Sequence, residues 1–203
     1  MRAEAVVDLS AIKHNVALLK ERAGTNLLAV VKADAYGHGL ENGLRGFAAA
    51  DGLSLIEFDR AVQLRDLGWT KPIMMMQGMF EASDLDLISH YQLQPVLHNA
   101  EQLEMLAKAS LSKPIHVHLK INTGMNRLGI PFPSAQKLSG NFYGIMSHFA
   151  ESGLPNHATT VSQKANFYEL CENLRAEHYS MSNSGAVQNK ILAFCRWCRV
   201  EIF

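Results

Sequence analysis

The stretch LLAVVKADAYGHG (residues 27–39) joins a short apolar run to a lysine and a glycine-rich turn. Residues 27–31 have the length and the β-branched content of a buried strand, and the following turn residues end it. A lysine rarely ends a buried strand without a partner or a task. We therefore expect Lys32 to lie at the carboxyl end of a core strand and to have a chemical role.

Seven further apolar runs follow, and helical patterns separate most of them. They lie at residues 52–56, 72–76, 93–98, 115–121, 142–149, 178–182 and 198–203. Strands that alternate with helices form a parallel sheet, and eight such units close into a TIM-type (β/α)8 barrel of the α/β class. Only residues 131–141 join the fifth run to the sixth, and the chain stops on its eighth run. We therefore expect a barrel that is not fully complete.

Residues 1–24 precede the barrel within what we interpret as a single domain, residues 1–203. They predict a strand and then an amphipathic helix with Ile12, Val16 and Leu19 on one stripe, capped by Asp8 or Ser10. We expect this segment to lack a packing partner and the last strand to be exposed, which would lower stability.

Composition argues against several classes of partner. Nineteen Lys and Arg balance nineteen Asp and Glu, so we expect neither a nucleic-acid nor a membrane partner. No apolar run approaches the roughly 20 residues of a membrane span, and the first residues lack a signal-peptide core, which predicts a cytoplasmic protein. Three cysteines fit a reducing compartment, and the single C-x-x-C at 195–198 is a weak zinc or redox signal.

A barrel of this kind carries its reactive groups at the carboxyl ends of its strands. The polar residues at these positions are Lys32, Lys120, Asn122, Arg127, His148, Ser182, Asn183, Ser184 and Arg199. Desolvation favours a neutral lysine, and a neutral amine can attack a carbonyl carbon to form a Schiff base. Taken singly, each residue also has an ordinary structural interpretation. His116, His118 and Lys120 share one strand face, but no third ligand of clear origin completes a zinc set, so we predict no metal site.

Five segments together carry a family resemblance. The segments AVVKADAYGHG (29–39), HLKINTGMNRLG (118–129), MSHFA (146–150), SNS (182–184) and WCRVEI (197–202) resemble, in this order, those of the alanine racemases. The resemblance extends over essentially the whole chain. It implies an isomerase that interconverts L- and D-alanine, a peptidoglycan precursor, with pyridoxal 5′-phosphate (PLP) bound in the barrel. Serine stays an alternative substrate.

The resemblance also implies roles for individual residues. Lys32 matches the lysine that holds PLP and serves as one of two acid/base groups. Tyr36 and Ser184, with neighbouring Asn183, match residues that contact the phosphate, and the backbone near Ile202 would contact the same group. Around the ring, Arg199 matches the residue at the pyridine nitrogen, Arg127 the one near the phenolic oxygen, and His148 the one beside the ring. Lys120 matches a lysine that is carbamylated in some members, and Asn122 stands where an aspartate is usual.

Arg199 favours racemisation over other PLP chemistry. A carboxylate at the pyridine nitrogen keeps that nitrogen protonated and makes the ring a deep electron sink. An arginine is always cationic and opposes this protonation. The shallower sink suits a brief exchange of the α-proton. It argues against a decarboxylase of the same cofactor fold, in which an acidic residue holds that position.

Besides Asn122, the sequence departs from the family pattern in two further respects. The family has a second, β-rich domain, whose tyrosine supplies the opposing base in the partner of a homodimer. No tyrosine of this chain lies in a matching motif, so we expect a shortened racemase with impaired activity and little dimer surface. Glu201 replaces a glycine that approaches the phosphate, and its charge would repel that group. A non-catalytic, single-barrel PLP-binding protein and an inactive remnant are the alternatives.

Overall fold

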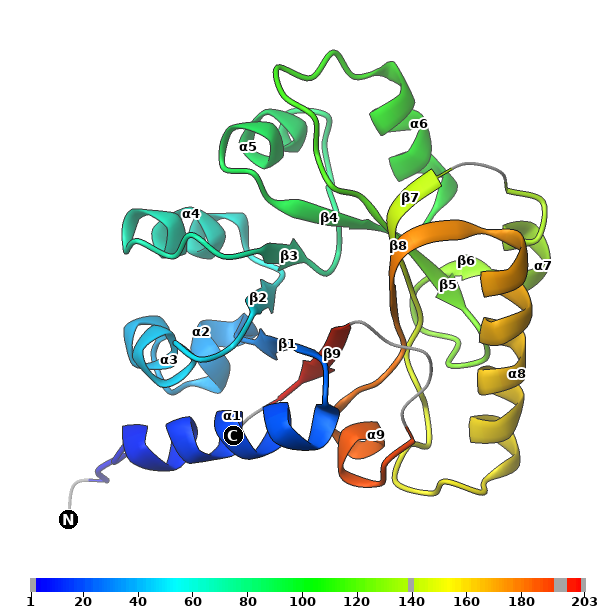
Figure 1. Ribbon diagram of the computed structural model, residues 1–203. Coiled ribbons are helices and arrows are strands. Elements are labelled where there is room, and N and C mark those ends of the chain that lie inside the picture. Colours follow the sequence, from blue (N-terminus) through cyan, green and yellow to red (C-terminus); the bar gives the residue numbers. More distant parts are fainter. Residues whose placement is uncertain (1–2, 139–140, 192–196, 202–203) are drawn as a thin grey trace.

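The computed structural model describes residues 3–138, 141–191 and 197–201, which form a parallel barrel surrounded by helices (Figure 1). Each of the eight predicted apolar runs overlaps one strand, and a further two-residue strand, β6, lies beside β5. The strands are β1 (Asn26–Val30), β2 (Gly52–Leu55), β3 (Ile73–Met75), β4 (Gln94–Leu97), β5 (His118–Asn122), β6 (Ile130–Pro131), β7 (Asn141–Met146), β8 (Arg175–Ser180) and β9 (Trp197–Val200).

The order of the strands brings the two ends of the sheet together. It is β8-β7-β5-β4-β3-β2-β1-β9, and all of the pairings are parallel. Across the remaining seam, the Arg199 N–H donates to the Ser182 carbonyl at 3.2 Å. The barrel is therefore nearly closed. The prediction that the last strand is exposed is therefore wrong, because all four residues of β9 are buried.

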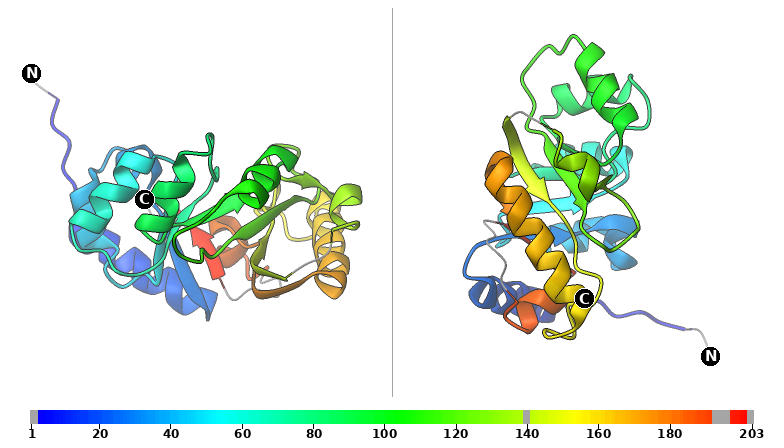
Figure 2. Two further views of the ribbon diagram at one scale, coloured as in Figure 1. Left: turned by 90° about the horizontal axis from the view of Figure 1, so that it is seen from above. Right: turned by 90° about the vertical axis from the view of Figure 1, so that its right-hand side faces the viewer.

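Helices connect successive strands and cover the outside of the barrel (Figures 1 and 2). They are α1 (Leu9–Ala23), α2 (Lys32–Tyr36), α3 (Leu40–Gly46), α4 (Phe58–Asp66), α5 (Asp84–His90), α6 (Ala100–Lys108), α7 (Phe132–Ala135), α8 (Ala158–Asn173) and α9 (Ser184–Gln188). The short connection between the fifth and sixth runs contains β6 and the single turn of α7. None of the described helices combines the length and apolarity needed to cross a membrane.

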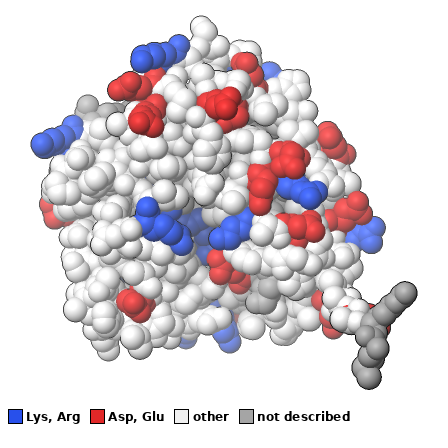
Figure 3. All heavy atoms as spheres, turned by 180° about the vertical axis from the view of Figure 1, so that it is seen from behind, with Lys and Arg blue, Asp and Glu red and all other residues white. Residues whose placement is uncertain are grey.

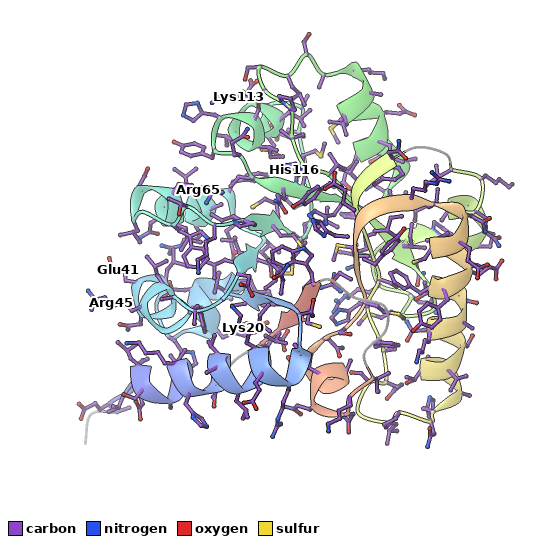
Figure 4. All side chains as sticks on the ribbon, in the orientation of Figure 1. Lys20, Glu41, Arg45, Arg65, Lys113 and His116 are labelled. Atoms are coloured by element: carbon purple, nitrogen blue, oxygen red, sulfur yellow. The ribbon has the colours of Figure 1, made fainter. Side chains whose placement is uncertain are left out.

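The first segment differs in part from the prediction. Asp8 caps α1 by accepting from the N–H groups of Ser10 and Ala11, and the predicted apolar stripe is buried. Residues 3–8 contain no strand, however. The helix is not orphaned either, because it lies against α3, β1 and α9, and Lys20 pairs with Asp51 at 2.8 Å (Lys20 is labelled in Figure 4). The prediction that this segment lacks a packing partner is therefore wrong, because α1 packs against elements of the barrel itself.

The interior of the barrel is apolar in its middle and polar on either side. Leu28, Met74, Val96, Met146 and Trp197 form the apolar layer. On the amino-terminal side of this layer, His118 contacts the Gln94 side chain at 2.9 Å, and burial lowers its pKa to about 3. A neutral imidazole there can donate to the amide oxygen. The polar layer on the other side, at the carboxyl ends of the strands, carries the candidate site.

Candidate active site

A cavity of about 190 Å³ opens at the carboxyl ends of the barrel strands. Figure 3 shows Lys and Arg side chains gathered around a hollow near the centre of the face opposite to that of Figure 1. The residues that line the cavity are Val30, Lys32, Met76, Lys120, Arg127, Met146, His148, Asn183, Ser184, Gly185, Arg199 and Glu201. Four basic side chains and one carboxylate therefore share this small space.

Lys32 enters the cavity from the start of an unusual turn. Ala33, Asp34, Ala35 and Tyr36 all have φ between 52° and 54°, so α2 turns in the left-handed sense. This geometry returns the chain toward the lysine and places Nζ of Lys32 5.6 Å from the centroid of the Tyr36 ring. Lys32 is half-buried rather than buried.

Two carboxylates hold the left-handed turn in place. An oxygen of Glu57, just before α4, accepts from the Ala33 N–H at 2.9 Å. The Asp34 side chain accepts from the Leu40 N–H at 3.0 Å, at the start of α3. Left-handed backbone costs about 1–2 kcal/mol per residue for side chains larger than glycine. These tertiary contacts offset that cost and fix the position of Lys32 and Tyr36.

Lys120 is the deepest lysine of the cavity, with 7% of the residue exposed. It lies on β5 and faces the interior together with His118. Burial, together with the charges of Arg199, Arg127 and Lys32, lowers its pKa to about 7. We expected a desolvated amine at Lys32, but Lys120 is the more deeply buried of the two lysines.

Arg199 and His148 form a connected pair below the mouth of the cavity. Arg199 is 4% exposed, and its guanidinium donates to the Ser147 carbonyl and lies 3.4 Å from Nδ1 of His148. Burial and the Arg199 charge hold the pKa of His148 far below its usual value, so the imidazole is neutral. Arg199 can only donate, so Nδ1 faces a donor, and Nε2 in turn lies 3.4 Å from the Asn183 amide nitrogen.

The loop that carries Arg127 is folded by a polar side chain and a glycine. The Asn122 side-chain oxygen accepts from the N–H groups of Gly124 and Asn126, at 3.1 and 3.0 Å. Gly129 has φ of 132°, and a Cβ there would lie 2.6 Å from the Asn122 nitrogen. Only glycine allows the loop to return this closely to β5. Asn122 therefore shapes the loop, while Arg127 reaches the cavity.

The segment after β8 brings further polar groups to the cavity. The Asn183 side-chain oxygen caps α9 through the Ala186 N–H at 3.0 Å and accepts from the Ser152 hydroxyl at 2.6 Å. Ser184 instead contacts residue 201: its hydroxyl oxygen accepts from the Glu201 N–H at 2.9 Å and lies 3.3 Å from the Glu201 carbonyl. Asn183 thus lines the cavity mainly as a helix cap.

Most of the predicted site residues lie together. Those that line the one cavity are Lys32, Lys120, Arg127, His148, Asn183, Ser184 and Arg199. Tyr36 adjoins it beside Lys32, Ser182 lies buried just before Asn183, and Ile202 lies outside the described residues. Among the described residues no group of three His, Cys, Asp or Glu could hold a metal ion.

The sequence reasoning missed two kinds of residue. The apolar lining of Val30, Met76 and Met146 follows from alternation along the strands, since every second residue faces the interior. Gln163 on α8 was also missed: its side chain donates to the His148 carbonyl and accepts from the Ala150 N–H, both at 2.9 Å. No local signal marks it, because its role depends on helix packing.

Comparison with known proteins gives one consistent family. A family model for the N-terminal domain of alanine racemases matches residues 7–202. The alanine racemase of Janthinobacterium sp. (strain Marseille) is 42% identical over 98% of this chain and 58% of its own length. That of Azoarcus sp. (strain BH72) is 38% identical, over 98% and 59%. The chain thus spans a little over half the length of these curated relatives.

Solved structures show the same similarity. The biosynthetic alanine racemase of Pseudomonas aeruginosa superposes with a TM-score of 0.86 at 34% identity, over 97% of this chain and 57% of that one. An alanine racemase from Bartonella henselae with covalently bound pyridoxal phosphate has a TM-score of 0.83 at 23% identity, over 97% and 58%. At 23% identity, the similarity to the Bartonella henselae structure shows a shared fold.

Proposed function

Because this chain belongs to the alanine racemase family, we propose that it forms the PLP-binding barrel of an enzyme that interconverts L- and D-alanine. One observation carries the proposal: Lys32, Arg127, His148 and Arg199 come from four separate segments and line a single cavity. Each of them matches a position to which the family resemblance gives a role. Serine is the alternative substrate.

The residues of the cavity fit an anionic cofactor bound through an aldehyde. Its lining has four basic side chains against the carboxylate of Glu201, although the whole chain has a formal net charge of zero. This concentration of positive charge favours an anionic ligand. The amine of Lys32 reaches the same space, where it can condense with an aldehyde. Lys32, Arg127, His148 and Arg199 would hold the ring, and Tyr36 and Ser184 lie at the proposed phosphate end.

When bound, PLP supplies an electron sink that lowers the barrier to removing an α-proton. Lys32 would hold the cofactor and, once released by the substrate amine, take the α-proton at Nζ or return it. Arg199 keeps its own charge at all working pH values and therefore opposes protonation of a ring nitrogen beside it. Neutral His148 accepts from Arg199 and orients it. These roles suit proton exchange at one carbon.

Lys120 supports a further part of the proposal. A pKa of about 7 gives a large fraction of neutral amine at neutral pH. The neutral amine is the form that reacts with carbon dioxide, so the expected carbamylation of Lys120 is chemically accessible. The product would place a negative charge beside Arg127, whose charge already acts on this lysine.

Borohydride trapping tests the proposal. PLP is mixed with the protein, the adduct is made permanent by reduction, and the labelled peptide is mapped. We expect the label on Lys32, its loss in Lys32→Ala, and its retention in Lys137→Ala, which changes an exposed lysine. A label on another lysine contradicts the proposal. Exchange of the alanine α-proton in heavy water then separates an active racemase from a non-catalytic PLP carrier, which shows only the exchange of free PLP.

A further inference from the structure

Residue 201 contacts both side chains at the proposed phosphate end of the cavity. Its backbone N–H donates to the Ser184 hydroxyl oxygen at 2.9 Å, and its carbonyl lies 3.3 Å from the same oxygen. Burial of Tyr36, together with the charge of the nearby Glu201 carboxylate, raises the pKa of the Tyr36 phenol, and Glu201 lines the same cavity as Ser184. Residue 201 is therefore adjacent to both of the groups that a phosphate would need.

The contacts of Glu201 leave little for a phosphate to use. The Glu201 carboxylate acts on the Tyr36 phenol, whose pKa is raised by burial and by this neighbouring negative charge. The Ser184 hydroxyl has one proton, and the Glu201 carbonyl lies within reach of it. A phosphate at this end must therefore lie beside a carboxylate and compete with the Glu201 carbonyl for the Ser184 hydroxyl proton.

Electrostatic repulsion acts in the same direction. Two like charges in contact repel each other, and Glu201, although exposed, lines the same cavity as Ser184. Two of the four basic groups are committed elsewhere, because Arg199 is bound to Ser147 and His148 and Lys120 lies deep inside the barrel. A ligand with a neutral hydroxyl at this end would meet no such repulsion and could donate to the carboxylate.

We propose that Glu201 determines which form of the cofactor this cavity accepts, by opposing the phosphate of PLP while leaving the unphosphorylated aldehyde, pyridoxal, unaffected. This inference rests on the proposed function, since it takes Lys32 as the attachment point. It concerns a position at which this chain carries a carboxylate in place of the glycine that the family resemblance implies.

The test compares the dissociation constants of PLP and pyridoxal in the 203-residue chain and in two variants. Glu201→Gln removes the charge and keeps the shape, and Glu172→Gln removes a charge from an exposed position on α8. Binding is followed by the absorbance of the lysine-bound aldehyde, and circular dichroism checks the fold. We expect Glu201→Gln to tighten PLP binding at least tenfold and to change pyridoxal binding less than threefold, with Glu172→Gln equal to the parent.

The outcomes separate this inference from the proposed function. If PLP and pyridoxal label Lys32 in the parent and the ratio of their dissociation constants is the same in Glu201→Gln, the inference is wrong and the proposed function stands. If neither aldehyde labels Lys32 in the parent or in Glu201→Gln, the proposed function fails and the inference fails with it. Equal tightening of both aldehydes in Glu201→Gln also overturns the inference, because it shows no selection at the phosphate end.

Discussion

Lys120 makes the stability of the barrel depend on pH. In the unfolded chain its amine holds a proton up to its usual pKa of 10.5, whereas in the folded protein it releases the proton near pH 7. Between these values the unfolded state binds more protons, so stability rises with pH. Below about pH 7 both states are protonated, and the full cost of the buried charge is present.

We therefore expect the free energy of unfolding to increase from about pH 7.5 to about pH 9, by up to roughly 1.4 kcal/mol per pH unit from this group. Lys120→Met keeps the length of the side chain and removes the charge, so the variant should be more stable than the parent at pH 7 and less dependent on pH. Urea unfolding at several pH values measures both quantities. Equal slopes in parent and variant would contradict the assignment.

Sequence reasoning predicted which residues would lie close together but not their environments. Lys32, Lys120, Arg127, His148 and Arg199 follow from the rule that a barrel's reactive groups lie at the ends of its strands, and the structure brings them to one cavity. Which lysine is desolvated depends on how far each side chain lies inside the barrel. That depth is set by packing across strands distant in the sequence, which no local pattern reveals.

At the scale of elements, the left-handed turn of α2 carries strain that one substitution can relieve. Ala33 is exposed and has φ of 52° and ψ of 52°. Glycine adopts this conformation without the steric cost, although it loses more entropy on folding. We expect Ala33→Gly to raise the free energy of unfolding by about 0.5–1 kcal/mol, measured by urea unfolding.

Ala17→Gly is the matched control for this prediction. Ala17 is also exposed but lies within the right-handed helix α1, where glycine should lower stability by about 1 kcal/mol. The two substitutions are chemically identical and should have opposite signs. Destabilisation of similar size in both variants would show that the turn is not strained as described.

The elements themselves differ in how far the sequence predicts them. The eight barrel strands follow from apolar runs, and the Asp8 cap of α1 follows from its position before an amphipathic pattern. The predicted strand before α1 did not form, because Val6 is exposed and residues 3–8 pair with no described strand. The left-handed turn was not predictable, since alanine favours right-handed helix and the contacts that reverse it come from Glu57 and Asp34.

At the scale of the molecule, the barrel depends on contacts that hold the segments leading into its strands. Arg65 on α4 donates to the carbonyls of Trp69 and Lys71, before β3, and to those of Tyr91 and Gln92, before β4 (Figure 4). The seam between β8 and β9 has much less support. In the described residues β8 and β9 share no strand pairing, and the contacts across the seam include the Arg199–Ser182 backbone bond, the Ser184–Glu201 contacts and a His178–Trp197 ring contact at 5.9 Å.

The seam should therefore be the place where the barrel opens most readily, and a cofactor should close it. Ser184 follows β8 while Arg199 and Glu201 belong to the other side, and all three line the cavity. A ligand that contacts both sides and binds only the closed barrel stabilises it by about 2.7 kcal/mol at 100 times its dissociation constant. We expect PLP at that concentration to slow hydrogen exchange of the Arg199 amide by up to about 100-fold, with little change in the amides of α6.

The variant Lys32→Ala should lose most of this protection, because PLP is no longer held covalently. Equal slowing across α6 and β9 would mean that the barrel opens only by global unfolding, and the seam would then have no independent motion.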